Sequence, residues 1–143
     1  MSPLFDEQWK ENRNLFKQMD HLVSFVNKQD VKGLTIKPLE DEGRSPFLIL
    51  DVAASAGTKE GATAPDYTVL MYGHLDKQPF GDGWETDPCD PVIKEDGKLY
   101  GRGSSDDGYA FFTAILSIKA CQDLGLSHPR IIVTIEGSEE GEM

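Results

Sequence analysis

The sequence predicts an α/β fold with a mainly parallel sheet flanked by helices. Residues 67–73 form an almost unbroken apolar run, which is typical of a strand that is covered on both faces, and a second apolar run from Ile131 to Ile135 indicates another buried strand at 130–136. Helical periodicity precedes the first run and recurs between the two runs. Strands that alternate with helices indicate helices packed in layers on a sheet, with right-handed crossovers between parallel strands.

The first helix is expected over about residues 4–28. Apolar side chains recur there at spacings of three, four and seven, which places them on one face of a helix. His21 lies in the same segment, and because an isolated histidine lacks co-ligands we expect it to be a surface or packing residue. We expect the apolar stripe to pack into the core and to form no cofactor site; its members are Phe5, Trp9, Phe16, Met19, Val23 and Val26.

The remaining elements follow from apolar runs and from turn residues. Glycine and proline mark the ends of most of them, because glycine adopts the left-handed backbone conformation that turns and helix ends require. In chain order we expect a strand at 46–53, a flexible loop at 55–66, a hairpin at 91–103 that turns at Asp96-Gly97, and a helix that carries Phe111, Ala114, Ile115, Ile118 and Cys121 on one face and stops at Gly125.

Composition narrows the class of protein. The 143 residues suffice for one domain, and the net charge of −11 arises from 25 Asp and Glu against 14 Lys and Arg. So acidic a surface repels phosphate backbones and anionic membranes, so we expect neither a nucleic-acid nor a membrane partner. Cys89 and Cys121 lie too far apart for a metal knuckle and are expected as reduced thiols. With no signal-peptide-like or membrane-spanning segment, a cytoplasmic location is expected.

Three polar clusters follow the apolar segments. In open α/β sheets, functional groups gather outside the carboxyl ends of the strands. The first and third clusters follow buried strands directly, and the loop of the second can bring it to the same rim. The clusters are His74 with Asp76, Asp106 with Asp107, and Glu139 with Glu140.

One imidazole among several carboxylates is the ligand chemistry of a borderline-to-hard metal ion. Residues i and i+2 of a strand point the same way, so Asp76 can hold one ring nitrogen of His74 while the other nitrogen binds metal. In the pair Glu139-Glu140, one carboxylate can bind metal and its neighbour can act as general base. Alone, a Glu-Glu pair is ordinarily solvated surface and an Asp-Asp pair ordinarily caps a helix. Their joint placement therefore carries the prediction.

Four motifs together carry a family resemblance. "YGHLDKQP", "GW", "DGKLYGRGSSDDG" and "EGSEEGE" occur in this order. Over residues 1–143 the chain resembles the amino-terminal part of the catalytic domain of the co-catalytic zinc metallopeptidases. That family includes the carnosinases, the cytosolic nonspecific dipeptidases, the glutamate carboxypeptidases, the aminoacylases and the succinyl-diaminopimelate desuccinylases. The wording of the motifs is most similar to the carnosinase and nonspecific dipeptidase branch.

The resemblance implies a role for each candidate residue. His74 and Glu140 would each bind one metal ion, and Asp106 would bridge two. Glu139 would be the general base, and Asp76 would orient His74. The implied cofactor is a pair of Zn²⁺ ions, for which Mn²⁺ or Co²⁺ would fit the same ligands.

The resemblance also implies a cis peptide bond between Asp106 and Asp107. One difference from the family stands nearby: many relatives carry a Lys-Gly pair one residue after the bridging aspartate, where this chain has Gly108-Tyr109. This difference leaves two substrate classes open, namely dipeptides or short peptides and N-acyl amino acids.

The ligand count is incomplete in this chain. Two metal ions that share one carboxylate need about five protein groups, and three are in place. His128 precedes the strand at 130–136, which puts it about 25 Å from the rim, so it is not expected to be a ligand. Asp82, Asp87 and Asp90 remain open, although nothing marks out any of them.

The expected parent is therefore longer than this chain. The resemblance implies that the missing Asp and His ligands, the lid domain and the contacts of a homodimer follow residue 143. The parent would hydrolyse dipeptides or short peptides with water activated by two metal ions, whereas residues 1–143 alone would be inactive and bind one metal weakly. The alternatives are an N-acyl amino acid amidohydrolase and a non-catalytic module that binds metal or a partner. An incomplete set of helices also predicts exposed apolar sheet surface and an open strand edge.

Overall fold

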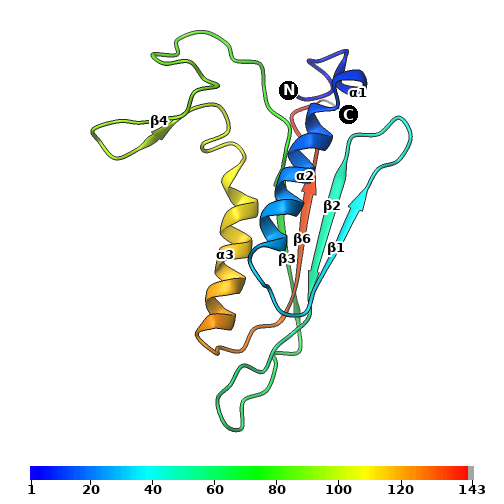
Figure 1. Cartoon of the computed structure of the whole chain (residues 1–143), viewed down its shortest axis with the longest axis vertical. Helices are drawn as coiled ribbons and strands as arrows, with labels where there is room; N and C mark the ends of the chain where they lie inside the picture. Colours follow the sequence, from blue (N-terminus) through cyan, green and yellow to red (C-terminus); the bar gives the residue numbers. More distant parts are fainter. Residues whose placement is uncertain (142–143) are drawn as a thin grey trace.

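The computed structural model describes residues 1–141. It contains a four-stranded sheet and two long helices, which lie beside the sheet (Figure 1). The strand order in the sheet is β1-β2-β6-β3. The strands are β1 (Leu34–Leu39), β2 (Phe47–Val52), β3 (Thr68–His74) and β6 (Arg130–Glu136). Three of these four were expected from the sequence, and β1 was not.

The α/β class is confirmed, but the sheet is mixed and not mainly parallel. β3 and β6 pair in parallel, whereas β2 pairs antiparallel with both β1 and β6. The apolar run of β2 gives no information on strand direction, which is why the sequence did not show this. β1 and β2 are joined by a short connection, and only an antiparallel pair can be closed that way. β1 carries Pro38 at the outer edge of the sheet, where a missing N–H costs least.

The expected single helix over residues 4–28 is divided in two. α1 (Trp9–Asn12) and α2 (Asn14–Asn27) are separated by Arg13, whose φ of 53° is left-handed. The side chain of Asn12 accepts the backbone N–H of Asn14 at 2.8 Å, and such local bonds compete with helical hydrogen bonding. This competition at the junction accounts for the break between α1 and α2.

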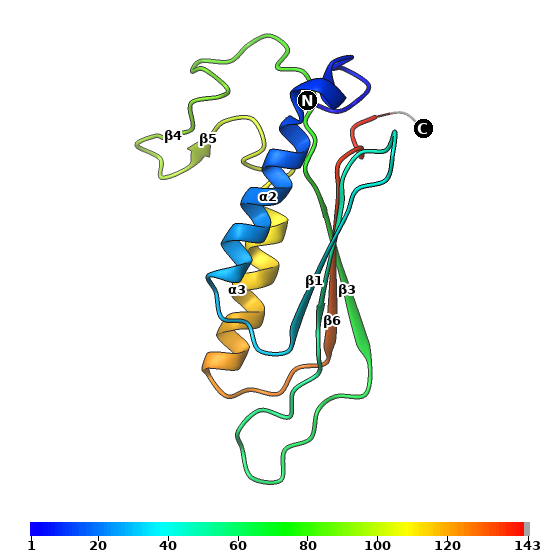
Figure 2. The ribbon, with the colours of Figure 1, turned by 45° about the vertical axis from the view of Figure 1, so that its right-hand side comes forward.

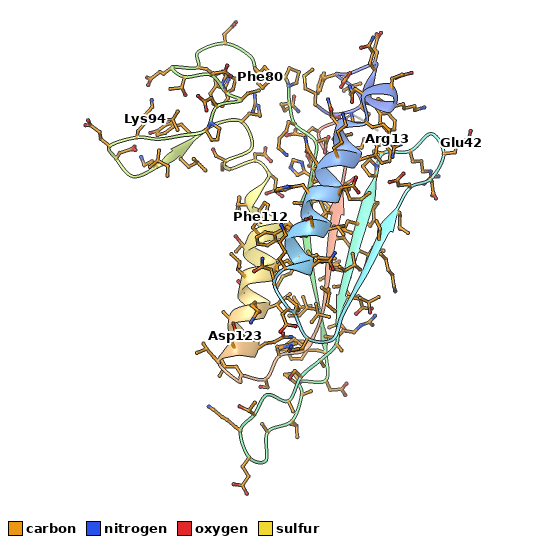
Figure 3. The ribbon with its side chains drawn as sticks, in the orientation of Figure 1. Arg13, Glu42, Phe80, Lys94, Phe112 and Asp123 are labelled. Carbon is orange, nitrogen blue, oxygen red and sulfur yellow. The ribbon has the colours of Figure 1, made fainter. Side chains whose placement is uncertain are left out.

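Both long helices, α2 and α3 (Tyr109–Asp123), lie on the same face of the sheet (Figure 2). Alternate residues of β2 and β6 point toward them and are buried. Phe112 lies between the two helices (Figure 3), with its ring edge-on to Phe25 at a centroid distance of 4.8 Å. The core between helices and sheet is built mainly from Leu15, Met19, Val26, Leu48, Leu50, Val52, Phe111, Ile115, Ile118, Ile131, Val133 and Ile135.

The expected turn elements are confirmed. β4 (Val92–Ile93) and β5 (Leu99–Tyr100) form a small antiparallel hairpin that turns through Gly97 at φ 75°. The chain leaves α3 through Gly125 at φ 64°. His128 is buried at the amino end of β6, where its Nδ1 lies 2.9 Å from the carbonyl oxygen of Pro129. It therefore lies at the end of the sheet opposite the polar clusters, as the distance argument predicts.

The face of the sheet opposite the helices is open in the described part of the chain. Leu70 and Tyr72 of β3 point to that side and are 67% and 51% exposed. β3 is also an edge strand, with no partner beyond it among residues 1–141. The prediction of exposed apolar sheet surface and an open edge is borne out for these residues. The same residues contain no helix that is long and apolar enough to cross a bilayer.

We predict that residues 1–143 self-associate through this open face and that Leu70→Lys weakens the association at least several-fold. A lysine in the patch places a charge that docking would have to desolvate. Sedimentation velocity over a range of concentrations measures the effect. Leu124→Lys is the matched control, because Leu124 is similarly exposed (73%) but lies at the end of α3. A wild-type chain that remains monomeric throughout would contradict the prediction.

Candidate metal centre

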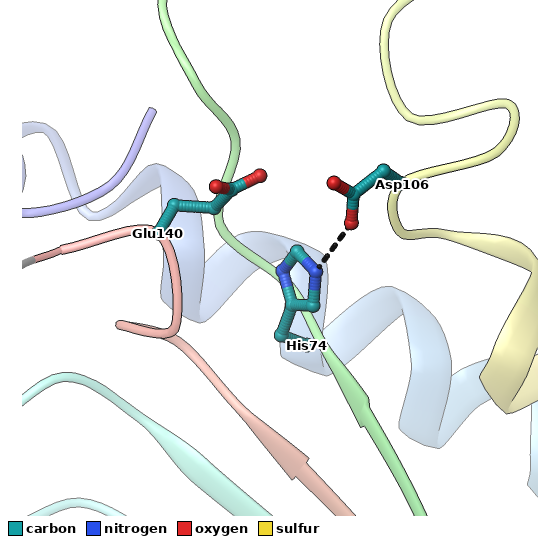
Figure 4. A group of neighbouring side chains, drawn as sticks. All are labelled: His74, Asp106 and Glu140. Atoms are coloured by element: carbon teal, nitrogen blue, oxygen red, sulfur yellow. Dashed lines mark hydrogen bonds and ion pairs between the residues drawn. The ribbon is translucent and has the colours of Figure 1, made fainter.

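The three polar clusters meet at the carboxyl ends of β3 and β6. His74 is the last residue of β3 and lies in register with Glu136, the last residue of β6. Glu140 follows β6 after a short turn, and Asp106 precedes α3. Figure 4 shows the carboxylates of Asp106 and Glu140 on either side of the His74 ring. The parallel pairing thus brings together side chains that are far apart in the sequence.

One ligand atom from each of His74, Asp106 and Glu140 lies within 4.8 Å of the other two. His74 Nε2 is 3.0 Å from Asp106 Oδ1, and 3.9 Å from Oε2 of Glu139. The side chain of Asp106 is 77% exposed and that of Glu139 is 45% exposed, so both carboxylates can be reached from solvent.

The ring of His74 is buried, and Asp76 contacts its Nδ1 on the side away from Asp106. Its Nδ1 lies 3.1 Å from the backbone oxygen of Asp76 and 3.5 Å from the nearer carboxylate oxygen of the same residue. Burial lowers the pKa of this imidazole, but the hydrogen bond to Asp106 and the contacts with Asp76 outweigh burial, so the net pKa is raised. The backbone carbonyl of Asp76 is the closer support of the ring, and the carboxylate has other partners.

Asp107 links β3 to the start of α3. Its Oδ2 accepts the backbone N–H of His74 at 3.1 Å, and its Oδ1 accepts the N–H groups of Gly108 and Ala110. Gly73 makes room for this link, because a Cβ there would lie 2.7 Å from Asp107 Oδ2. The residues described contain no cis peptide bond. The expectation of a cis bond between Asp106 and Asp107 is therefore wrong here, and the bond has the trans form that is ordinary without proline.

The segment after His74 holds the two glutamates. Both carboxylate oxygens of Asp76 accept a backbone N–H, one from Glu139 and one from Glu140, each at 3.0 Å. Gln78 Nε2 donates to Oε2 of Glu140 at 2.6 Å. The sequence reasoning missed Gln78, although it stands in the same motif as His74 and Asp76.

A lysine lies within this acidic rim. Lys77 Nζ donates to the carbonyl oxygens of Leu75 and Asp76, at 2.6 and 3.0 Å. Burial lowers the pKa of Lys77, and the surrounding carboxylates only partly offset this. Sequence reasoning missed Lys77 too, since a lysine beside carboxylates carries no metal-site signal.

The donor set fits one divalent cation. One imidazole nitrogen and two carboxylate oxygens are suitable ligands for Zn²⁺ or Mn²⁺, and three groups leave coordination positions open for water. Within residues 1–141 no second group of three His, Cys, Asp or Glu side chains comes as close together. Asp87 uses a carboxylate oxygen to accept the N–H of Cys89, and neither Asp82 nor Asp90 joins the cluster.

Comparison with known proteins identifies the family. The family model described as "Peptidase family M20/M25/M40" matches residues 70–143, just over half of the chain. The chain belongs to this peptidase family. The match begins within β3 and includes every residue of the candidate metal centre. The suspected resemblance is thereby confirmed at the level of the family.

Relatives of this peptidase chain extend over nearly all of it. It is 35% identical over 139 residues to the Beta-Ala-Xaa dipeptidase of Lactobacillus delbrueckii subsp. lactis, with 88% of this chain and 29% of the relative covered. It is 40% identical over 120 residues to the succinyl-diaminopimelate desuccinylase of Sulfurovum sp., with 84% and 25% covered. The crystal structure of human carnosine dipeptidase 1 superposes with a TM-score of 0.73 at 26% identity, over 96% of this chain and 29% of that one. The chain thus spans between a quarter and a third of the length of these proteins.

Proposed function

We propose that these residues form the amino-terminal part of the catalytic domain of a metal-dependent dipeptidase. His74, Asp106 and Glu140 bind metal, and Glu139 is the general base. The observation that carries the proposal is the convergence of three ligand atoms within 4.8 Å, from three separate segments of the chain. The dipeptidases among the relatives support the choice of reaction.

Each residue has a distinct task in peptide hydrolysis. A bound divalent cation polarises the scissile carbonyl and lowers the pKa of water. His74 Nδ1 faces the backbone oxygen of Asp76, which favours the ring proton on that nitrogen and leaves Nε2 as the ligand. Glu139, half-exposed and adjacent to the cluster, takes a proton from the attacking water and passes it to the leaving amine.

We further propose that the parent holds two ions, with Asp106 as the shared ligand. Two such ions need about five protein groups. His74, Asp106 and Glu140 supply three, so the others come from outside residues 1–143, together with the lid domain and the contacts of a homodimer. Zn²⁺ is the default ion, and Mn²⁺ or Co²⁺ fits the same donors. Residues 1–143 alone then bind one ion weakly and give little or no turnover.

The free thiols of Cys89 and Cys121 favour a reducing compartment such as the cytoplasm.

A second candidate function is hydrolysis of an N-acyl amino acid. The 40% identity to a succinyl-diaminopimelate desuccinylase favours it, since that relative covers 84% of this chain. Side-by-side assays of dipeptides and N-acetyl amino acids on the longer protein separate the two functions. A third reading, a non-catalytic module that binds metal or a partner, would require both assays to be negative on that protein.

We predict that residues 1–143 bind one equivalent of Zn²⁺ and that His74→Ala reduces the affinity at least about tenfold, because it removes the imidazole ligand. Isothermal titration calorimetry measures both quantities. His21→Ala is the matched control, since His21 is exposed on α2 and lies outside the cluster. Equal affinities for the wild-type chain and the His74 variant would refute the assignment of His74.

We predict that Glu139→Gln in the longer protein lowers kcat for dipeptides about 10²- to 10⁴-fold, the usual contribution of a general base. KM and the metal content should change little, because Glu139 is not proposed as a ligand. Steady-state kinetics with metal analysis of the same preparation gives all three values. Loss of metal together with activity would instead make Glu139 a ligand.

A further inference from the structure

The carboxylate of Asp76 is fully buried and has two backbone partners. Its oxygens accept the N–H groups of Glu139 and Glu140, each at 3.0 Å. A buried carboxylate is stable only when hydrogen bonds or opposite charge compensate it. These two N–H groups are its direct hydrogen-bond partners, and Lys77 is the nearby positive charge.

This arrangement differs from a carboxylate that mainly orients a histidine. His74 Nδ1 is closer to the backbone oxygen of Asp76, at 3.1 Å, than to its carboxylate, at 3.5 Å. Replacing the carboxylate therefore leaves the nearest support of the ring in place. The same replacement removes what holds the peptide groups of the two glutamates.

The glutamates need this support because the strand ladder ends before them. The last backbone bond between the two segments joins Leu75 N–H to the carbonyl oxygen of Glu136 at 2.6 Å. After this bond, the two hydrogen bonds to the carboxylate of Asp76 join the segment after β3 to the turn after β6. Gln78 adds a bond to the carboxylate of Glu140 at 2.6 Å, so Glu140 is held at its backbone and at its side chain.

We propose that Asp76 is a positioning residue for the adjacent glutamates. By fixing two consecutive peptide N–H groups, it sets the backbone so that Glu140 enters the metal cluster while Glu139 lies beside His74. The inference deepens the proposed function, on which the roles of the two carboxylates rest. The positioning itself exists without metal and can be measured without it.

The test is amide hydrogen exchange by NMR on metal-free residues 1–143. Asp76→Asn keeps the shape of the side chain but exchanges one acceptor oxygen for an NH₂ group, so one of the two N–H groups loses its partner. Exchange at Glu139 or Glu140 should then accelerate about tenfold or more, while the amides of Leu50 and Val133 stay protected. Asp107→Asn is the matched control: it is also a buried carboxylate bonded to backbone N–H groups at the same rim, but it does not touch the glutamates. Unchanged exchange at both glutamates in the Asp76 variant would overturn the proposal.

A measurement on the wild-type chain covers the case in which the variant does not fold. Scalar coupling across a hydrogen bond reports that bond directly, here between the amide nitrogens of Glu139 and Glu140 and Cγ of Asp76. Slow amide exchange with measurable coupling supports the proposal. Fast amide exchange without coupling overturns it. Zn²⁺ titration then tests the consequence, with affinity expected to fall about 10- to 100-fold in Asp76→Asn. A wild-type chain that binds no Zn²⁺ would refute the proposed function, whereas the amide data would still decide the role of Asp76.

Discussion

The parallel pairing of β3 with β6 is the constraint on which the site depends. It sets Thr68 opposite Arg130 and His74 opposite Glu136, so both strands end at the same level. Buried residues of β6 and β2 fix this register against the helices, since a slip by one residue would turn Ile131, Val133 and Ile135 outward. The position of His74 relative to the end of β6 is therefore a consequence of core packing, and Leu75, the neighbour of His74 in the chain, is itself a core residue.

The carboxylates at this edge of the sheet fall into two groups, one buried and one accessible to solvent. Asp76 and Asp107 are buried, and each is committed to backbone N–H groups that join two segments of chain. Asp106 and Glu139 are exposed and Glu140 is half-buried, so these three remain accessible to an ion or to water. In each pair of adjacent acidic residues, the two carboxylates thus differ in burial or in the groups that they contact. Asp106 and Asp107 differ in burial, while Glu139 and Glu140 share one buried anchor and point to different partners. Two acidic residues in succession can in this way serve both structure and chemistry.

The sequence predicted the elements that local patterns encode. The apolar runs located β2, β3 and β6, and Gly97 and Gly125 located the hairpin turn and the end of α3. The break at Arg13 was missed because the hydrogen bonds of Asn12 that cause it leave no periodic pattern in the sequence. β1 was missed because it is a mostly exposed edge strand that contains a proline and has no continuous apolar run. The expectation of a mainly parallel sheet was wrong because an apolar run such as that of β2 carries no information on strand direction. At the site, residue types and strand ends predicted which side chains converge. Which oxygen of Asp76 or Asp107 binds which N–H depends on backbone geometry that no spacing in the sequence specifies.

The proposed function depends on His74, Asp106 and Glu140 binding the same metal ion. X-ray absorption spectroscopy of residues 1–143 loaded with one equivalent of Zn²⁺ tests it most directly, because imidazole, oxygen and sulfur ligands give distinct signals. We predict one imidazole nitrogen, with oxygen atoms completing the coordination shell, at about 2.0–2.2 Å. A spectrum without imidazole, or one with a sulfur ligand at about 2.3 Å from Cys89 or Cys121, would contradict it.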